Sequence, residues 1–309
     1  MLRALLGLVA GLIVAALAAY LLGVEPEQFL ATLRGVSPWT IVGCAASTFV
    51  VIGLQSFRWY LVMKPLLGFR YAQAIRTQLV GTMLNAFLPA RGGDLIKVQY
   101  VGRLSGKRRV TILGAELVDR WLDWWGWFPI LMVLSVAETL PKWLYTALGL
   151  FSAFHATWAT VLLVLSRRGY VPREGSRFGE VIESFRSGIQ AFRSVRTLAI
   201  AFLVSPLSWV WETIVLSLLG RAFDFELTLG MAFSLLIAFN LAMVVPSLGA
   251  IGTFEAGGAA ALVFFGMDQS KALAFMFVYH FTQLLPGVVG GAAVIVAEGE
   301  RLFRKKTET

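Results

Sequence analysis

Long apolar runs recur along this chain and are separated by short polar segments. A helix needs roughly 20 predominantly apolar residues to cross the hydrocarbon core of a membrane. Water is absent from that core, so each run must satisfy its own backbone N–H and C=O groups as a helix. Only 15% of the residues are charged, against about 25% in soluble domains. The sequence therefore predicts an all-α polytopic integral membrane protein with a single transmembrane domain over residues 1–309.

One kind of segment occurs twice, at residues 84–94 and at residues 239–255. In each copy an apolar run that carries an Asn is broken by Pro, reopened through Gly and followed by a carboxylate. Beyond each copy, a glycine stands 14 residues before a basic residue: Gly106 before Arg120, and Gly266 before His280. Paired apolar segments interrupted by Pro and Gly indicate the binding site of a transporter built from two repeats.

The first copy is not expected to cross the membrane completely. Basic residues flank it on both sides, at 64–76 and at 97–109, and basic loops face the cytoplasm. Residues 71–104 are therefore predicted to form a re-entrant hairpin that turns at about residues 89–93. Non-helical backbone at that depth is tolerated only where protein or water forms hydrogen bonds with its free N–H and C=O groups. The second copy is predicted to enter from the opposite side over residues 227–266.

Six other apolar runs are predicted to cross the membrane completely: Ala4–Leu22, Trp39–Met63, Val110–Val136, Trp143–Leu165, Thr197–Leu219 and Ala272–Ala297. The first run could instead be a secretory signal, but it is long for one and many spans follow it, so we expect a retained helix. Residues 25–34 are expected to form a polar loop. Three crossings in each half invert the second half, which predicts an inverted repeat with halves at about residues 1–137 and 143–298.

The distribution of basic residues sets the predicted orientation. Most of the 27 Lys and Arg residues fall on one side of this topology, which is therefore the cytoplasmic side. Both termini are predicted to be cytoplasmic, in a multi-pass protein of the cell (inner) membrane. The net charge of +9 is attributed to cytoplasmic loops and not to nucleic acid, which we do not expect as a partner. Residues 167–196, rich in arginine, are expected to form a cytoplasmic basic amphipathic segment on the inner leaflet.

Four ionisable residues lie at helical spacing within the run at 110–136: Glu116, Asp119, Arg120 and Asp123. They form a stripe on one helix face, and charges at membrane depth are functional candidates because burying them is costly. Two interpretations stay open. In one, the stripe neutralises itself, with Arg120 pairing with Glu116 and Asp123. In the other, the Arg120 guanidinium grips a phosphate through two hydrogen bonds.

The tip of the first hairpin is the strongest candidate for binding a ligand. Arg91 precedes Gly92 and Gly93, where the returning helix would begin, with Asn85 before this point and Asp94 after it. The free amides and the positive dipole end of a helix start attract anions. The alternative is an ordinary helix start with Arg91 in water.

The second copy offers a similar helix start from the outer side. Its candidate residues are Asn240, Gly252, Thr253 and Glu255. His280 is a further candidate, either as a titrating group or as a buried, hydrogen-bonded histidine. Glu212 lies within a span and needs either a structural partner or a ligand. Arg58, near the end of a span, is expected to extend to the membrane interface.

These residues resemble the lysylphosphatidylglycerol synthetase transmembrane-region family of flippase-like membrane proteins. The matching patterns are Leu84-Asn85-x3-Pro89-x-Arg91-x-Gly93-Asp94, Tyr100-x-Gly102-Arg103, Glu116-x3-Arg120-x2-Asp123, Pro246-x2-Gly249-x2-Gly252-x2-Glu255, Gly266 and Tyr279-His280. In the family the first motif commonly reads Pro-Ser-Arg-Ala-Gly-Glu, so Gly92 and Asp94 are mild departures. His280 stands where an arginine commonly follows the tyrosine, which is a larger departure.

The resemblance implies movement of polar-headed lipids between the leaflets. Some members of the family also carry a soluble domain that transfers lysine to phosphatidylglycerol, and we expect that domain to be absent here. The leading hypothesis is a lipid flippase or transporter for an anionic or phosphate-bearing lipid, with membrane lipids as its partners and without an enzymatic activity.

Two alternatives are kept. One is an intramembrane enzyme that uses Glu116, Asp119 and Asp123 as acid and base. The other is an accessory subunit that docks a lipid-modifying enzyme. We expect neither a cofactor nor a metal site, because the spacings of metal ligands or of a nucleophile and its base are not found. With Cys44 as the single cysteine, an intrachain disulfide is excluded.

Overall fold

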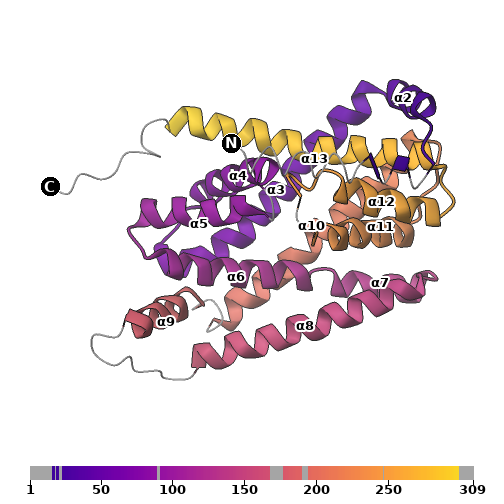
Figure 1. Ribbon diagram of the computed structural model, residues 1–309. Coiled ribbons are helices and arrows are strands. Elements are labelled where there is room, and N and C mark those ends of the chain that lie inside the picture. The colour runs from indigo at the N-terminus through magenta and orange to yellow at the C-terminus, as the bar shows by residue number, and fades with distance from the viewer. Residues whose placement is uncertain are drawn as a thin grey trace.

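The structure is a computed structural model that describes residues 16–17, 19–20, 23–88, 91–167, 177–189, 194–245 and 247–298. The regular elements in these residues are helices: α2 (Pro26–Gly35), α3 (Pro38–Leu67), α4 (Tyr71–Phe87), α5 (Gly92–Ser105), α6 (Arg109–Trp125), α7 (Phe128–Ala137), α8 (Lys142–Arg167), α9 (Arg177–Gly188), α10 (Val195–Ala222), α11 (Leu229–Ala242), α12 (Thr253–Phe264) and α13 (Gln269–Glu298). In Figure 1, α13 runs along the bundle, and it packs against α4 of the first hairpin and α12 of the second.

Three of the described helices are long and apolar enough to cross a membrane: α3, α10 and α13. They contain 30, 28 and 30 residues. At 1.5 Å per residue each is about 42–45 Å long, which exceeds the hydrocarbon core of ~30 Å. These helices confirm the predicted all-α polytopic membrane protein. The total of six spans stays a prediction, and the first of them, residues 4–22, lies almost wholly outside the described residues.

The predicted span at residues 110–136 is divided into two consecutive helices, and whether it crosses the membrane stays a prediction. α6 ends at Trp125, and α7 begins at Phe128 with Pro129 in its first turn. Proline has no N–H to continue the preceding helix. Gly126 also packs closely on α10, where an added Cβ would stand 2.8 Å from Ser205. The predicted span at 143–165 corresponds to α8, which contains 26 residues.

Two short helical hairpins occupy the places of the repeated segments. α4 packs against α5, and α11 packs against α12. The longest of these four helices is α4, with 17 residues, or about 26 Å, so it falls short of the hydrocarbon core. This geometry agrees with re-entrant hairpins. The proline positions expected at the turns, 89 and 246, lie outside the described residues.

The tips of the two hairpins touch. An added Cβ at Gly249 would lie 2.6 Å from the carbonyl oxygen of Ala86. Gly249 also has φ 56°, a left-handed conformation that glycine adopts without steric cost. A larger residue would therefore push the tips apart, so this contact sets how closely the two repeated segments approach.

α13 packs along α4 through a strip of glycines. Added Cβ atoms at Gly287, Gly290 and Gly291 would stand 2.4–2.7 Å from side-chain or backbone atoms of α4. Membrane helices associate through such small residues because lipid supplies little hydrophobic driving force between helices. This strip holds the last spanning helix against the first hairpin.

The expected polar loop at residues 25–34 is wrong, because this segment forms α2. Pro26 occupies the first turn, Glu27 is acidic there, and Arg34 is basic in the last turn. The fixed φ of proline suits the first turn of a helix. An acid at the start and a base at the end interact favourably with the helix macrodipole. The backbone N–H of Glu25 donates to Ser270 Oγ at 3.0 Å, which ties α2 to the start of α13.

α9 lies within the arginine-rich segment and packs against α6. An added Cβ at Gly188 would stand 2.0 Å from the carbonyl oxygen of Thr111, and Ile189 is fully buried. Part of the apolar face that was expected to contact the inner leaflet therefore contacts protein. The location of this segment at the membrane stays a prediction, and residues 168–176 and 190–193 lie outside the described residues.

The first hairpin predicts that both of its outer ends face the cytoplasm. Arg70 precedes α4, Lys107 follows α5, and both are exposed. In a Cys44→Ala background, single cysteines at positions 70 and 107 should react with a membrane-impermeant thiol reagent only from the cytoplasmic side. Reaction of either cysteine from the outside would show that this segment crosses the membrane completely.

The close packing inside the first hairpin predicts that Gly93→Ala is strongly destabilising. An added Cβ would lie 2.4 Å from the Gly81 carbonyl oxygen and 2.5 Å from the Asn85 amide nitrogen, both backbone atoms. Such overpacking costs about 1–3 kcal/mol or more. The control is Gly149→Ala in α8, where an added Cβ meets nothing within 4 Å. Thermal unfolding in detergent should show a lower melting temperature for Gly93→Ala only.

Candidate functional site

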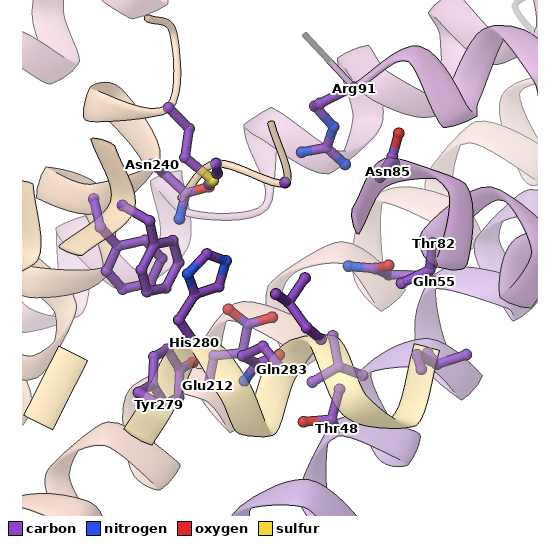
Figure 2. Close-up of a pocket in the computed structure, with 18 of the residues that line it drawn as sticks. Thr48, Gln55, Thr82, Asn85, Arg91, Glu212, Asn240, Tyr279, His280 and Gln283 are labelled. Atoms are coloured by element: carbon purple, nitrogen blue, oxygen red, sulfur yellow. The ribbon is translucent and has the colours of Figure 1, made fainter. Parts of the chain in front are cut away.

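A cavity of about 240 Å³, with both polar and apolar residues in its wall, is lined by the ends of the two hairpins. Its wall also includes residues of α3, α6, α10 and α13. Figure 2 shows Arg91 and Asn85 on one side of the cavity, and Glu212, Tyr279 and His280 on the other. The two repeated segments of the sequence therefore contribute to one site.

Arg91 stands at the tip of the first hairpin and begins α5 in a left-handed conformation, with φ 54°. Its Nε lies 3.4 Å from the Asp94 carboxylate, and its side chain is 55% exposed. The Asn85 amide donates to the same carboxylate at 3.0 Å. Gly92 and Gly93 form the first turn of α5, where amides have no acceptor within the helix. The structure thus brings together all five predicted residues of this tip.

Arg120 is held by three carboxylates. Its Nε lies 3.0 Å from Glu116 and 3.6 Å from Asp94, and its Nη1 lies 3.9 Å from Asp123. Arg120 does not line the cavity, whereas Asp123 does. This geometry is that of the self-neutralising stripe. Asp94 is an additional partner, contributed by α5, that helical spacing within α6 does not reveal.

Two buried cations of this network were not identified from the sequence. Lys97 Nζ lies 2.7 Å from Glu116, and the Arg58 guanidinium lies 2.9 Å from Asp119 and 2.5 Å from Asp123. Both basic side chains are 1% exposed. The expected positions, Arg58 at the interface and Lys97 in a basic flank, were wrong because both side chains turn toward α6. The signal was present, since the α6 stripe carries three acids and a single base.

The network joins four acids and four bases among the described residues: Asp94, Glu116, Asp119 and Asp123 with Arg58, Arg91, Lys97 and Arg120. The formal charges balance, which suits membrane depth, where an unpaired charge is expensive. The Lys97 and Glu116 end is buried, while Arg91 and Asp123 reach the cavity wall. A polar path therefore leads from the protein interior to the cavity.

The second tip carries a smaller acid–base pair. One oxygen of Glu255 accepts from the Gly252 N–H at 2.7 Å, and the other lies 2.6 Å from His280 Nδ1. The His280 ring stacks on Phe254, with 4.2 Å between the ring centres, and lines the cavity. Glu255 is 4% exposed. The contacts of His280 are those of a buried, hydrogen-bonded histidine.

The other two candidates at the second tip make local contacts. The Thr253 and Ser247 hydroxyls share a hydrogen bond of 3.0 Å. The Asn240 amide donates to the carbonyl oxygen of Leu236 at 2.8 Å, and Asn240 lines the cavity. The contact between Asn85 and Asp94 at the first tip has no counterpart between Asn240 and Glu255.

The two acid–base pairs occupy equivalent positions in the repeated segments. Asp94 and Glu255 are each the third residue of the helix that follows a tip. Arg120 and His280 each lie 14 residues after the glycine near the end of that helix. Both pairs form, at 3.6 Å and 2.6 Å. This shared geometry supports an internal repeat, whose exact boundaries stay a prediction.

Glu212 is the acid in the cavity wall that has no partner among the described residues. It lies on α10 and lines the cavity, and its carboxylate has no hydrogen bond or ion pair to another described residue. The neighbouring indoles fix the rotation of α10. Trp209 donates to the Asp123 carbonyl at 3.0 Å, and Trp211 donates to the Ser47 carbonyl at 3.2 Å. The structure thus gives Glu212 no structural ion pair within the described residues.

The ion network predicts that losing a buried cation costs far more stability than losing a surface one. Arg58→Met should lower the free energy of unfolding by ~3–5 kcal/mol, because it strands two acids. The control Arg76→Met breaks an exposed pair with Glu298 and should cost less than ~1 kcal/mol. Adding Asp119→Asn to Arg58→Met should recover part of the loss. Thermal unfolding in detergent measures all three, and an equal loss for Arg58→Met and Arg76→Met would contradict the network.

The match to known proteins covers the whole site. Residues 6–291 match the model of a family described as the lysylphosphatidylglycerol synthase TM region. The chain is also similar to a UPF0104 membrane protein of Methanothermobacter thermautotrophicus, at 24% identity over 78% of this chain and 80% of that protein. The family match includes both hairpins, the α6 stripe and α10. The chain therefore belongs to the lysylphosphatidylglycerol synthase transmembrane-region family.

Proposed function

We propose that this protein is a lipid flippase that binds an anionic or phosphate-bearing headgroup in the cavity between the hairpin tips. The headgroup passes through the cavity from one leaflet to the other, while the acyl chains stay in the bilayer. The observation that carries the proposal is the position of Arg91. Among the described residues that line the cavity, it is the single Lys or Arg, and it stands at the start of α5.

The chemistry around Arg91 favours an anion. Its guanidinium presents five donors in a planar fork that matches phosphate oxygens. The amides of Gly92 and Gly93, with the positive end of the α5 dipole, add to this field. The neighbouring Asp94 is shared with Asn85 and Arg120, so it neutralises Arg91 only in part. Arg91 therefore retains donors for a ligand.

The size of the cavity supports a headgroup as the ligand. Sites that enclose a whole drug-sized molecule measure about 300–1,000 Å³, whereas this cavity measures about 240 Å³. It suits a small polar group and not two acyl chains. Family membership supports a lipid over a soluble anion, because the family is described by the membrane region of a lipid-modifying enzyme. Location in the cell membrane with cytoplasmic termini is part of the proposal.

The position between two opposed hairpins supports movement between leaflets. In transporters built from inverted repeats, the ligand lies at the repeat interface near the bilayer midplane, and one repeat rocks against the other. Here both tips line the same cavity, and an acid–base pair joins the first tip to α6 and the second to α13. Rocking of the halves would then open the cavity to each leaflet in turn.

The alternative of an intramembrane enzyme has weaker support. Glu116 and Asp119 are bound to Arg120, Lys97 and Arg58, and neither carboxylate lines the cavity. A general acid or base must reach the proton that it transfers. Asp123 does reach the cavity, but Arg58 and Arg120 hold it. Docking of a lipid-modifying enzyme remains an expectation about partners without a structural observation that favours it.

The test measures lipid movement in reconstituted vesicles. Phosphatidylglycerol labelled with a fluorophore on one acyl chain, near the headgroup, is quenched by dithionite only in the outer leaflet. The parent protein should expose the inner-leaflet pool faster than protein-free vesicles do. Arg91→Gln should slow exposure roughly tenfold or more, because losing a charged hydrogen-bond partner costs ~1.5–3 kcal/mol. Arg91→Lys should restore only part, because it keeps the charge and loses the fork.

The matched control is Arg103→Gln. Arg103 is exposed in the last turn of α5, on the same helix as the proposed site but away from the cavity. Its substitution removes the same charge and should leave the rate unchanged. If Arg91→Gln and Arg103→Gln both move lipid at the parental rate, Arg91 does not bind the headgroup. If the parent moves none of the labelled lipid, the flippase proposal itself fails.

A further inference from the structure

Glu212 differs from the other acids around the cavity. The carboxylates of α5, α6 and α12 all have a basic partner within 4 Å: Asp94, Glu116, Asp119, Asp123 and Glu255. Glu212 of α10 has none among the described residues. An ionisable side chain at membrane depth is expensive and marks a functional site by default. The structure therefore leaves one acid in the cavity wall to be satisfied by something that enters from the cavity.

The ionisable groups that face Glu212 come from several elements. Asp123 of α6 carries a like charge, Arg91 of the first tip carries the opposite charge, and Tyr279 and His280 come from α13. His280 is occupied by Glu255. On α3, Cys44 interacts electrostatically with Tyr279, and Arg58 binds Asp123. The other helices packed on α10, α7 and α11, carry no ionisable residue.

We infer that Glu212 is a proton-binding site, and that loading of an anionic headgroup at Arg91 is coupled to proton uptake by Glu212. This inference rests on the proposed function, because the headgroup is the anion. The proton comes from water in the cavity and adds to a carboxylate oxygen, which turns a repelling charge into a neutral O–H donor. No other reactant is required.

Electrostatic interactions inside a small cavity couple headgroup binding at Arg91 to proton binding at Glu212. Arg91 and Glu212 face the same cavity of about 240 Å³ from opposite sides (Figure 2). In a low-dielectric site, an ionised Glu212 attracts Arg91 and repels an arriving phosphate. A protonated Glu212 does neither, and its O–H can donate to a phosphate oxygen. Because linkage is reciprocal, a proton that favours the anion is itself favoured by the anion.

A headgroup ammonium is the other cation that could satisfy Glu212, and it predicts the opposite sign. An ammonium binds the ionised carboxylate, so loading an aminophospholipid would expel a proton. Loading phosphatidylglycerol through the proposed coupling takes up a proton. The direction of proton movement therefore separates the two.

The experiment counts protons during binding. The full-length protein in detergent is titrated with short-chain phosphatidylglycerol, or with short-chain phosphatidylethanolamine, in two buffers of different ionisation enthalpy. Calorimetry then gives the number of protons exchanged. The parent should take up as much as one proton per phosphatidylglycerol, and its affinity should fall by up to about tenfold per pH unit as the pH rises. Glu212→Gln should exchange no proton and bind equally across the same pH range.

The controls separate the possible failures. Glu226→Gln changes an exposed acid in the segment between α10 and α11 and should keep the proton uptake of the parent. Uptake that survives in Glu212→Gln would assign the proton to another group, such as His280 with Glu255, and overturn the inference. Proton release with phosphatidylethanolamine and none taken up with phosphatidylglycerol would replace it with an ammonium site.

If Glu212→Gln does not fold, measurements on the parent protein alone still test the coupling. Phosphatidylglycerol that binds the parent without proton uptake at any pH overturns the coupling and leaves the proposed function intact. Phosphatidylglycerol that does not bind the parent at all overturns the proposed function, and the coupling with it.

Discussion

The buried ion network around α6 is the constraint on which the rest of the arrangement depends. Three carboxylates on one face of a helix at membrane depth need counter-charges, and of the bases on α6 the one paired with them among the described contacts is Arg120. The missing cations come from α3, as Arg58, and from α5, as Lys97. Because each contact is short and buried, α3, α5 and α6 have little freedom to shift relative to one another. The first hairpin is therefore anchored by charge along its returning arm.

Close packing at glycines also fixes the positions of the hairpins. The strip at Gly287, Gly290 and Gly291 presses α13 against α4, and Gly249 brings the second tip against Ala86. Small residues are what allow helices to approach closely in a membrane, where lipid is as apolar as the side chains. The cavity lies beside the touching tips, where irregular backbone must be satisfied by protein or water.

The two tips share a geometry but differ in chemistry. The first pairs Asp94 with Arg120, an arginine that stays charged at all accessible pH values. The second pairs Glu255 with His280, a buried histidine whose ring also stacks on Phe254. The cavity between them has Arg91 on one wall and, on another, Glu212, which is unpaired among the described residues. The two walls of the cavity therefore offer different partners to a ligand, a guanidinium on one and a carboxyl group on the other.

The sequence by itself determined the membrane class and the two hairpins, and it offered the contact of Arg120 with Glu116 as one of two interpretations. These follow from local quantities, namely hydropathy, Pro and Gly positions, and spacing along one helix. Tertiary structure alone decided the burial of Arg58, whose partner Asp119 lies 61 residues away, and of Lys97, which local charge placed in a cytoplasmic flank. It also decided the break between α6 and α7, where Gly126 must fit against α10, and the isolation of Glu212. Which side chains of distant helices form ion pairs depends on how the helices pack. The periodicity within one segment does not contain that information.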